Sequence, residues 1–284
     1  MARILIAGCG AVGSRLGLML TADGHEVWGL RRQADAVPAP LWPLAADLRD
    51  RVSLICLPEG LDYIFYTASA GRFDEAAYRA AYVDGLHNLI EVLRAGEQEP
   101  RRLVFTSSTG VYGQTDGEWV DEDSPTEPPG FSGRCLLEGE RLLLGGPYPA
   151  TVVRLAGLYG PGPGRLLDLV RQGQAVCPSG PPRYTNRIHR DDAASALRHL
   201  MGLENPAPIY VGVDNEPAEL GTVYRWLANR LGVPEPRGGT AGEGLRPQGG
   251  NKRCRNRRLL ATGFTLRYPT YREGYGAILA PARG

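Results

Sequence analysis

The stretch RILIAGCGAVG, residues 3–13, joins an apolar run to a glycine-rich turn that opens a helix. The run predicts a buried strand, and the turn has GxGxxG spacing in the strand–turn–helix context that a dinucleotide site requires. Gly8 permits a tight turn, Gly10 lets the backbone approach a pyrophosphate, and Gly13 lets the helix pack closely on the strand. A purely structural turn is the alternative. The free N–H groups of the helix start are expected to bind the phosphates. The residues of this site are Gly8, Gly10, Ala11, Val12 and Gly13.

The end of the second expected strand, 26–30, indicates which dinucleotide is bound. Folds that take NAD usually place an acidic residue there for the ribose 2′-hydroxyl, whereas an arginine accommodates a 2′-phosphate. Here Arg31 and Arg32 follow the strand, and the next acidic residue is Asp35. Because a planar guanidinium binds phosphate oxygens in pairs, the sequence favours NADP over NAD. Two solvated loop arginines are the alternative.

Length and composition predict a single cytoplasmic α/β protein. The chain has 284 residues and a net charge of +1, which gives no overall attraction to nucleic acid or membrane. No apolar run approaches the roughly 20 residues that span a bilayer, and a strand rather than a signal peptide starts the chain. The five cysteines have no CxxC spacing and the four histidines no ligand spacing, which argues against a metal site.

Strand and helix patterns alternate, which predicts a doubly wound parallel sheet of the Rossmann type. The expected strands are 3–7, 26–30, 44–48, 62–68, 102–108 and 151–155, and the expected long helices are 74–95 and 132–144. Beyond Gly160, prolines interrupt short elements. We therefore expect an α/β fold with a dinucleotide-binding domain at 1–160 and a smaller C-terminal substrate lobe at 161–284, part of which can return to the sheet.

The order of several motifs indicates a family. In chain order they are GCGAVG at 8–13, Asp47-Leu48, YTASA at 66–70, SSTGVYG at 107–113, RLAGLYGPG at 154–162 and RIHRDDAA at 187–194. This order resembles the extended short-chain dehydrogenases/reductases, the group that includes nucleotide-sugar epimerases and dehydratases. Residues 253–275 resemble the closing segment of an atypical branch. The resemblance implies a Rossmann domain that binds NAD or NADP and a small-molecule substrate held by the C-terminal part.

The resemblance also implies roles for single residues. It places Asp47 and Leu48 against the adenine, and Thr67 and Ala68 behind the cofactor. Ser108 takes the hydroxyl position of the active site. The alternative for Ser108 and its hydroxyl neighbours is a set of caps at a strand end, which needs no catalysis.

Further residues are expected on the substrate side. Tyr112 would line the substrate pocket, and Tyr82 stands where the family commonly has asparagine. The arginines of the second half could surround an anionic group such as a diphosphate, although a solvated charged face is the alternative. The residues expected to bind substrate are Tyr82, Arg154, Tyr159, Arg187 and His189.

One departure from the family concerns proton transfer. Active members have a Tyr and, four residues later, a Lys on one helix; this chain has Ser132 and Leu136 at these positions. No change of register restores the pair, because Lys252 is the only lysine in the chain. A positioned proton donor contributes about a hundredfold to ten-thousandfold in rate, so its loss slows a reaction without forbidding it.

Two hypotheses follow. The first is an NAD(P)-dependent oxidoreductase or epimerase/dehydratase-like enzyme with an altered proton relay, with Ser108 and Tyr112 nearest the chemistry. The second is a redox-inert NADP(H)-binding regulatory or scaffold protein. The resemblance also implies a homodimer through the helices at 74–95 and 132–144.

Overall fold

The computed structural model describes residues 1–162, 164–239 and 250–280. Its centre is a seven-stranded sheet in which every pair of neighbours is parallel, with the order β12-β7-β5-β4-β1-β2-β3. This confirms the predicted doubly wound parallel sheet of the Rossmann type. The strands of the sheet are β1 Arg3–Ala7, β2 Glu26–Arg31, β3 Trp42–Ala45, β4 Tyr63–Tyr66, β5 Arg102–Ser108, β7 Ala150–Leu155 and β12 Ile209–Gly212.

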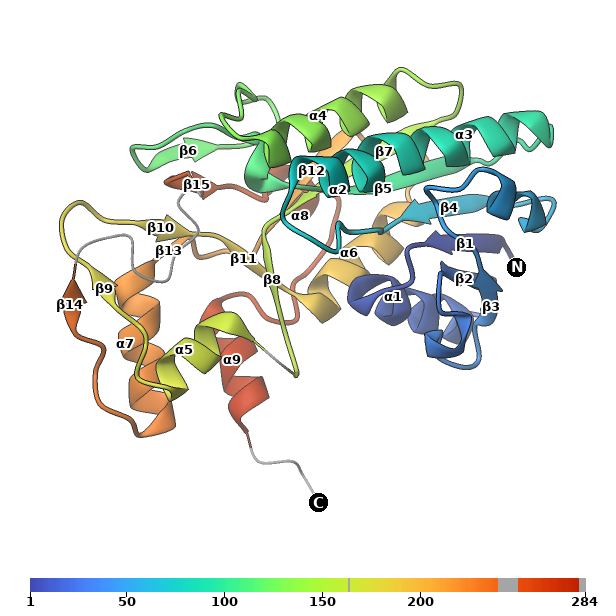
Figure 1. Cartoon of the computed structure of the whole chain (residues 1–284). Helices are drawn as coiled ribbons and strands as arrows, with labels where there is room; N and C mark the ends of the chain where they lie inside the picture. Colours follow the sequence, from blue (N-terminus) through green and yellow to red (C-terminus); the bar gives the residue numbers. More distant parts are fainter. Residues whose placement is uncertain (163, 240–249, 281–284) are drawn as a thin grey trace.

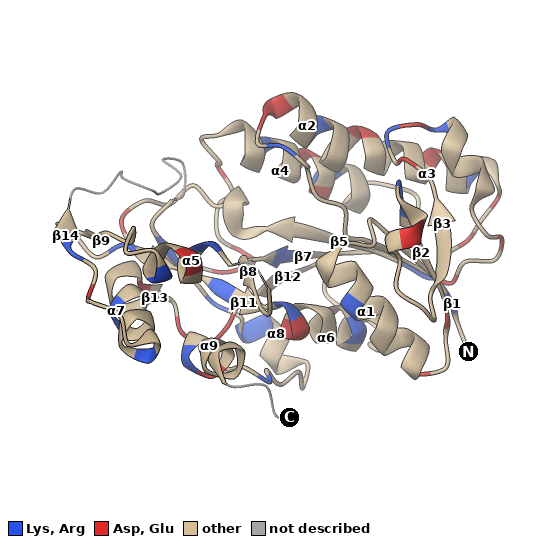
Figure 2. Cartoon of the chain, turned by 60° about the horizontal axis from the view of Figure 1, so that its bottom comes forward, with Lys and Arg blue, Asp and Glu red and all other residues tan. Residues whose placement is uncertain are grey.

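Helices cover both faces of the sheet (Figure 2). Helices α1 and α6 lie on one face, and α2, η3, α3 and α4 lie on the other. Acidic and basic residues are interspersed over both layers, as the near-zero net charge leads one to expect. The bounds are α1 Ala11–Ala22, α6 Arg190–Met201, α2 Glu75–Arg79, η3 Ala80–Asp84, α3 Gly85–Ala95 and α4 Phe131–Leu144.

The continuous apolar run of β1 reflects burial on both faces. Ile4 and Ile6 belong to the core beneath α1 and α6, whereas Leu5 and Ala7 belong to the core beneath α3 and α4. Strand β3 differs from the prediction, because it begins at Trp42 and ends before the expected 44–48 segment does. It is an edge strand, and none of its four residues is buried.

The expected helix at 74–95 is interrupted. A π-helical turn, η3, separates α2 from α3, and such turns often lie at functional sites. The Tyr66 hydroxyl donates a hydrogen bond to the Ala81 carbonyl oxygen at 2.6 Å. A Cβ on Gly139 would lie 2.4 Å from the Tyr82 carbonyl oxygen, so α4 and η3 approach closely through glycine.

Most of the second half of the chain forms a lobe beside the carboxyl ends of the strands (Figure 1). Strand β12 returns to the main sheet, so the chain crosses the boundary expected at residue 160. The lobe has its own core around Leu167, Val223 and Tyr271. The remaining short elements are η1 Ala34–Ala36, η2 Val52–Cys56, η4 Thr109–Val111, β6 Glu118–Val120, β8 Gly157–Tyr159, α5 Arg165–Arg171, β9 Cys177–Pro178, β10 Tyr184–Thr185, β11 Arg187–His189, β13 Ala218–Glu219, α7 Leu220–Leu231, β14 Gly238–Gly239, β15 Lys252–Cys254, α8 Arg257–Ala261 and α9 Tyr271–Leu279.

Within the described ranges, no helix combines the length and the apolar character needed to cross a membrane.

Candidate functional site

The three glycines between β1 and α1 meet different spatial demands. Gly8 has φ +90°, and a Cβ there would lie 2.4 Å from the Cα of Ala68. A Cβ on Gly13 would lie 2.6 Å from the hydroxyl oxygen of Thr67. A Cβ on Gly10 would meet nothing closer than the Gly8 oxygen at 3.9 Å. Packing within the chain therefore explains Gly8 and Gly13, whereas the bare backbone at Gly10 suits a ligand that approaches from outside.

The start of α1 is suited to phosphate. No side chain caps this helix, so its first N–H groups remain available. Ala11 is exposed and Val12 is buried beneath the turn. The Thr67 hydroxyl donates to the Gly8 carbonyl oxygen at 2.9 Å and fastens the end of β4 to the turn. These residues fit the pyrophosphate of a dinucleotide.

The two arginines after β2 are placed differently. The Nη1 atom of Arg31 donates to the carbonyl oxygens of Ala36 at 3.1 Å and Cys9 at 3.4 Å. Arg31 therefore braces the glycine turn. Arg32 is exposed beside it, so its guanidinium is the more accessible of the two to a phosphate group.

Asp47 is paired with an arginine that sequence reasoning missed. Its carboxylate accepts hydrogen bonds from Arg49 Nε at 3.0 Å and Nη2 at 2.6 Å. This hydrogen bonding to Arg49 lowers the pKa of Asp47. Leu48 is buried, and its carbonyl oxygen accepts a bond from Asn88. The pairing could have been predicted from the two-residue spacing between Asp47 and Arg49, because an Asp side chain often accepts a hydrogen bond from the backbone N–H two residues later.

Ser108 ends β5, at the sheet edge where the glycine turn also lies. Its side chain is half-buried, and its oxygen accepts a hydrogen bond from the Gly110 N–H at 3.1 Å. The hydroxyl proton is thus available to another acceptor. The same bond caps the short turn η4, so the capping role and a role in binding are compatible.

Behind Ser108 lies a buried network that includes two residues predicted on the substrate side. Arg154 donates to Glu140 through Nη2 at 2.7 Å and to the Tyr112 hydroxyl through Nη1 at 2.9 Å. Ser107 donates to Glu140 at 2.5 Å. The Arg154 and Glu140 side chains are only 4% and 2% exposed, and Tyr112 is 1% exposed. Arg154 and Tyr112 are therefore buried and bonded to each other, and their predicted contacts with substrate stay predictions.

Burial decides the protonation of Tyr112 as well. Desolvation raises the pKa of its phenol well above the ordinary value, more than the neighbouring Arg154 guanidinium lowers it. Tyr112 therefore stays neutral. Sequence reasoning missed Glu140, the residue whose charge holds this network together.

The positions of the absent Tyr and Lys lie on α4. Ser132 is half-buried in its first turn, and Leu136 is 5% exposed. Neither side chain can supply a phenol or an ammonium group. Ser108 therefore lies at the end of its strand, but α4 carries neither the Tyr nor the Lys that active family members have.

Tyr82 lies on η3, and its hydroxyl reaches the loop behind the cofactor positions. The hydroxyl accepts a hydrogen bond from the Ala70 N–H at 3.4 Å. The ring packs against Tyr78 and Phe105. Burial raises the pKa of Tyr82, so its phenol stays protonated at neutral pH. Its predicted contact with substrate stays a prediction.

Three other residues expected at the substrate lie inside the lobe. His189 is 1% exposed, and its Nδ1 accepts a bond from the Asp191 N–H at 3.1 Å, which caps α6. Tyr159 is buried against His189 and Tyr275. Arg187 is 3% exposed and its guanidinium stacks 5.1 Å from the Tyr271 ring centre. All three side chains are buried here, and Tyr159 belongs to the core of the lobe; their predicted contact with substrate stays a prediction.

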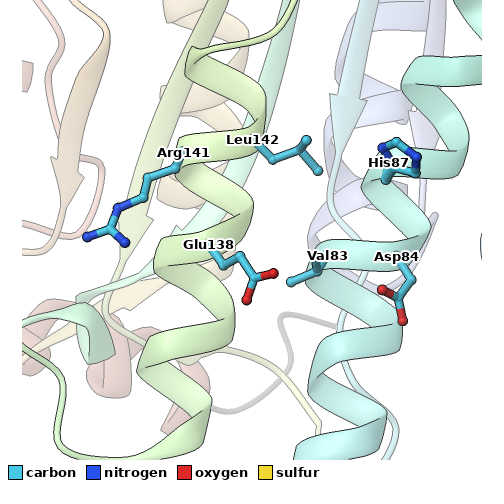
Figure 3. Close-up of a pocket in the computed structure, with 6 residues that line it drawn as sticks. All are labelled: Val83, Asp84, His87, Glu138, Arg141 and Leu142. Carbon is cyan, nitrogen blue, oxygen red and sulfur yellow. The ribbon is translucent and has the colours of Figure 1, made fainter.

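A shallow groove of about 540 Å³ lies elsewhere, between η3, α3 and α4. Figure 3 shows Val83 and Leu142 pointing toward each other across it, whereas Arg141 points away. The groove is on the outer helix layer and not at the carboxyl ends of the strands. It lies on the helices through which a homodimer is predicted, and that dimer stays a prediction.

Comparisons with known proteins agree with this geometry. A sequence profile of the NAD dependent epimerase/dehydratase family matches residues 4–206. Over 96% of this chain and 99% of the relative, the chain is 29% identical to a 3-diazoavenalumate denitrifying reductase from Streptomyces. A Methylobacillus flagellatus structure assigned to the NAD-dependent epimerases/dehydratases is 38% identical, with a TM-score of 0.81 over 98% of this chain and 97% of that chain. The Thermus thermophilus UDP-glucose 4-epimerase in complex with NAD shares the fold, with a TM-score of 0.81 at 21% identity, over 98% of this chain and 97% of that chain.

Proposed function

The chain belongs to the NAD dependent epimerase/dehydratase family, and we propose that it is an NADP(H)-dependent oxidoreductase that acts on a small anionic molecule. The turn at Gly8–Gly13 is the observation that carries the cofactor part of this proposal, because it joins β1 to an uncapped helix start and leaves room at the Gly10 Cβ position for a ligand. The resemblance to a named reductase over almost the whole length of both chains supports reduction rather than epimerisation.

The preference for NADP(H) is supported at the end of β2. This strand ends in Arg31, and no acidic residue follows before Asp35. Arg32 is exposed there and suits a 2′-phosphate. Arg49 neutralises Asp47 nearby, which reduces the repulsion that a carboxylate would exert on a phosphate.

The proposed reaction assigns separate roles to the cofactor, Ser108 and Tyr82. A bound nicotinamide dinucleotide would supply or accept a hydride. Ser108 is proposed to donate a hydrogen bond to the substrate oxygen that carries negative charge during the reaction. The Tyr82 hydroxyl is bonded to the Ala70 N–H and lies outside the Arg154 network, and we propose that it supplies the proton in place of the absent Tyr and Lys.

Turnover of NADPH tests this proposal. The purified protein is mixed with NADPH and a panel of aromatic carboxylic acids, aldehydes and nucleotide sugars, and loss of NADPH is followed optically. We expect at least one substrate to be reduced, and Ser108→Ala to slow it at least about a hundredfold. Tyr82→Phe should also slow it, whereas Tyr148→Phe should not, because Tyr148 lies two residues before β7 at the opposite sheet edge. Equal rates in all three variants would contradict the assigned roles.

A redox-inert NADP(H)-binding protein is the second candidate. The replacement of the Tyr/Lys pair by Ser132 and Leu136 favours it. It predicts cofactor binding with no turnover on the whole panel, and no isotope exchange at the nicotinamide C4 position. Any substrate-dependent exchange would exclude it.

A further inference from the structure

Lys252 is the one lysine among the 32 lysine and arginine residues of the chain. It begins β15, which pairs in parallel with β6. Figure 1 shows this pair of strands beside the carboxyl ends of the main sheet, where the lobe begins. The chain therefore uses its single lysine next to the candidate reaction site.

The contacts of Lys252 tie it to the turn that follows Ser108. Its Nζ donates a hydrogen bond to the Tyr112 carbonyl oxygen at 2.9 Å. Cys254 lies two residues later in the same strand, and its thiol shares a hydrogen bond with the Thr109 hydroxyl. Lys252 and Cys254 therefore both face the turn formed by residues 109–112, and Ser108 immediately precedes that turn.

The charge of Lys252 has no anionic partner among the described residues. Lys252 is only 6% exposed, and none of the ion pairs found in the described ranges includes it. Its hydrogen-bond partner is a neutral carbonyl. Burial raises the pKa of the Cys254 thiol to about 12, so this neighbour is neutral at ordinary pH and does not act as a thiolate.

This environment differs from that of the other strongly buried cation near the site. Arg154 is equally buried, but Glu140 compensates its charge. A buried ammonium without such compensation is costly, and burial lowers the pKa of Lys252 accordingly. An anion that enters beside Lys252 would remove this cost. An ammonium has three N–H donors, so two remain after the bond to Tyr112.

We propose that Lys252 is an anion-binding residue beside the 109–112 turn and that it holds a carboxylate or a phosphate group of the substrate. This inference rests on the proposed function, because it takes the bound anion to be part of a substrate. The binding of anions at Lys252 can nevertheless be tested without turnover. Its ammonium would fix one end of the molecule, while Ser108, at the other end of the same turn, meets the reacting oxygen.

A protein with a single lysine permits a direct test. Protein labelled with ¹⁵N-lysine has one side-chain Nζ resonance, which reports only Lys252. We would titrate the protein, with and without NADPH, with inorganic phosphate and with benzoate, using benzamide and sodium chloride of equal ionic strength as controls. We expect a saturable shift of the resonance with phosphate or benzoate and a rise in the pKa of Lys252. No shift beyond the controls with either anion would overturn the proposal, and the two anions distinguish a phosphate site from a carboxylate site.

Variants provide an independent readout. We expect Lys252→Met to weaken binding of the active anion at least tenfold and Lys252→Arg to retain part of it, with NADPH affinity unchanged within about twofold for both. Arg72→Met is the matched control, because Arg72 is an exposed cation paired with Asp74. Unchanged anion affinity in a folded Lys252→Met protein would contradict the proposal. If NADPH does not bind the native protein, the proposed function fails, but the resonance shift still decides the role of Lys252.

Discussion

Replacing Arg154 with leucine should destabilise the protein strongly. The change leaves the Glu140 carboxylate, whose side chain is 2% exposed, without its cation. Breaking a buried pair by removing one partner costs about 3–5 kcal/mol, because the remaining charge is neither solvated nor compensated. The same change leaves the Tyr112 hydroxyl without its donor. We therefore expect the free energy of unfolding to fall by about 4 kcal/mol.

Urea unfolding followed by circular dichroism measures this loss, and thermal unfolding should show a fall in Tm on the order of 10 °C. The double variant Arg154→Leu/Glu140→Leu should be more stable than Arg154→Leu alone, because it leaves no unpaired charge. Arg79→Leu is the matched control, because the partner of Arg79, Glu138, lies on α4, the helix that also carries Glu140. Arg79 and Glu138 form an exposed pair, and solvent screening makes such pairs weak. A loss below about 1 kcal/mol in Arg154→Leu would refute the view that this ion pair organises the site.

Two further changes test the backbone and the pH dependence. Gly8→Ala should abolish dinucleotide binding and lower the free energy of unfolding by at least about 1–2 kcal/mol. The reason is that φ is +90° and the new Cβ would meet the Ala68 backbone at 2.4 Å. Native-like affinity in a calorimetric titration would show that the turn is not the binding site. Burial raises the pKa of Asp214 from 3.8 to about 7. The folded state then binds this proton more tightly than the unfolded state. The protonated Asp214 therefore contributes to the free energy of unfolding below about pH 4, and this contribution is lost as pH rises toward 7. Asp214→Asn should remove that decline, which is at most about 4 kcal/mol; identical pH profiles of unfolding free energy in both proteins would contradict the assignment.

The fold could be predicted from the sequence because it depends on local patterns, whereas the cofactor-binding residues stay predictions. The GxGxxG spacing directly after an apolar strand predicts the turn that contains Gly8 and Gly13. Six of the seven strands of the sheet are expected from alternating apolar runs, whereas β12 at Ile209–Gly212 is not. The expected helix at 74–95 is broken by a π turn, at which the Tyr66 hydroxyl at the end of the preceding strand binds the Ala81 carbonyl oxygen. The helical period of the sequence does not predict that contact.

The substrate side was harder to predict, because burial there depends on tertiary contacts. Arg154 at the end of a strand has the pattern of an anion-binding residue. Its partner Glu140 comes from the preceding helix, and only the packing of α4 against β7 brings the two together. Arg187, His189 and Tyr159 lie in motifs of the family, but they are buried in the lobe. The position of Lys252 beside the 109–112 turn likewise depends on the pairing of β15 with β6.

The central claim is that the glycine turn binds NADP(H). A thermal-shift titration with NAD, NADH, NADP and NADPH tests it most directly, because a ligand at a hundredfold excess over its Kd stabilises the folded state by about 2.7 kcal/mol. We predict a selective rise in Tm with NADP or NADPH, reduced in Arg32→Ala and lost in Arg31→Ala/Arg32→Ala. An equal rise with NAD and NADP would contradict the cofactor preference, and no rise with any of the four would contradict the claim itself.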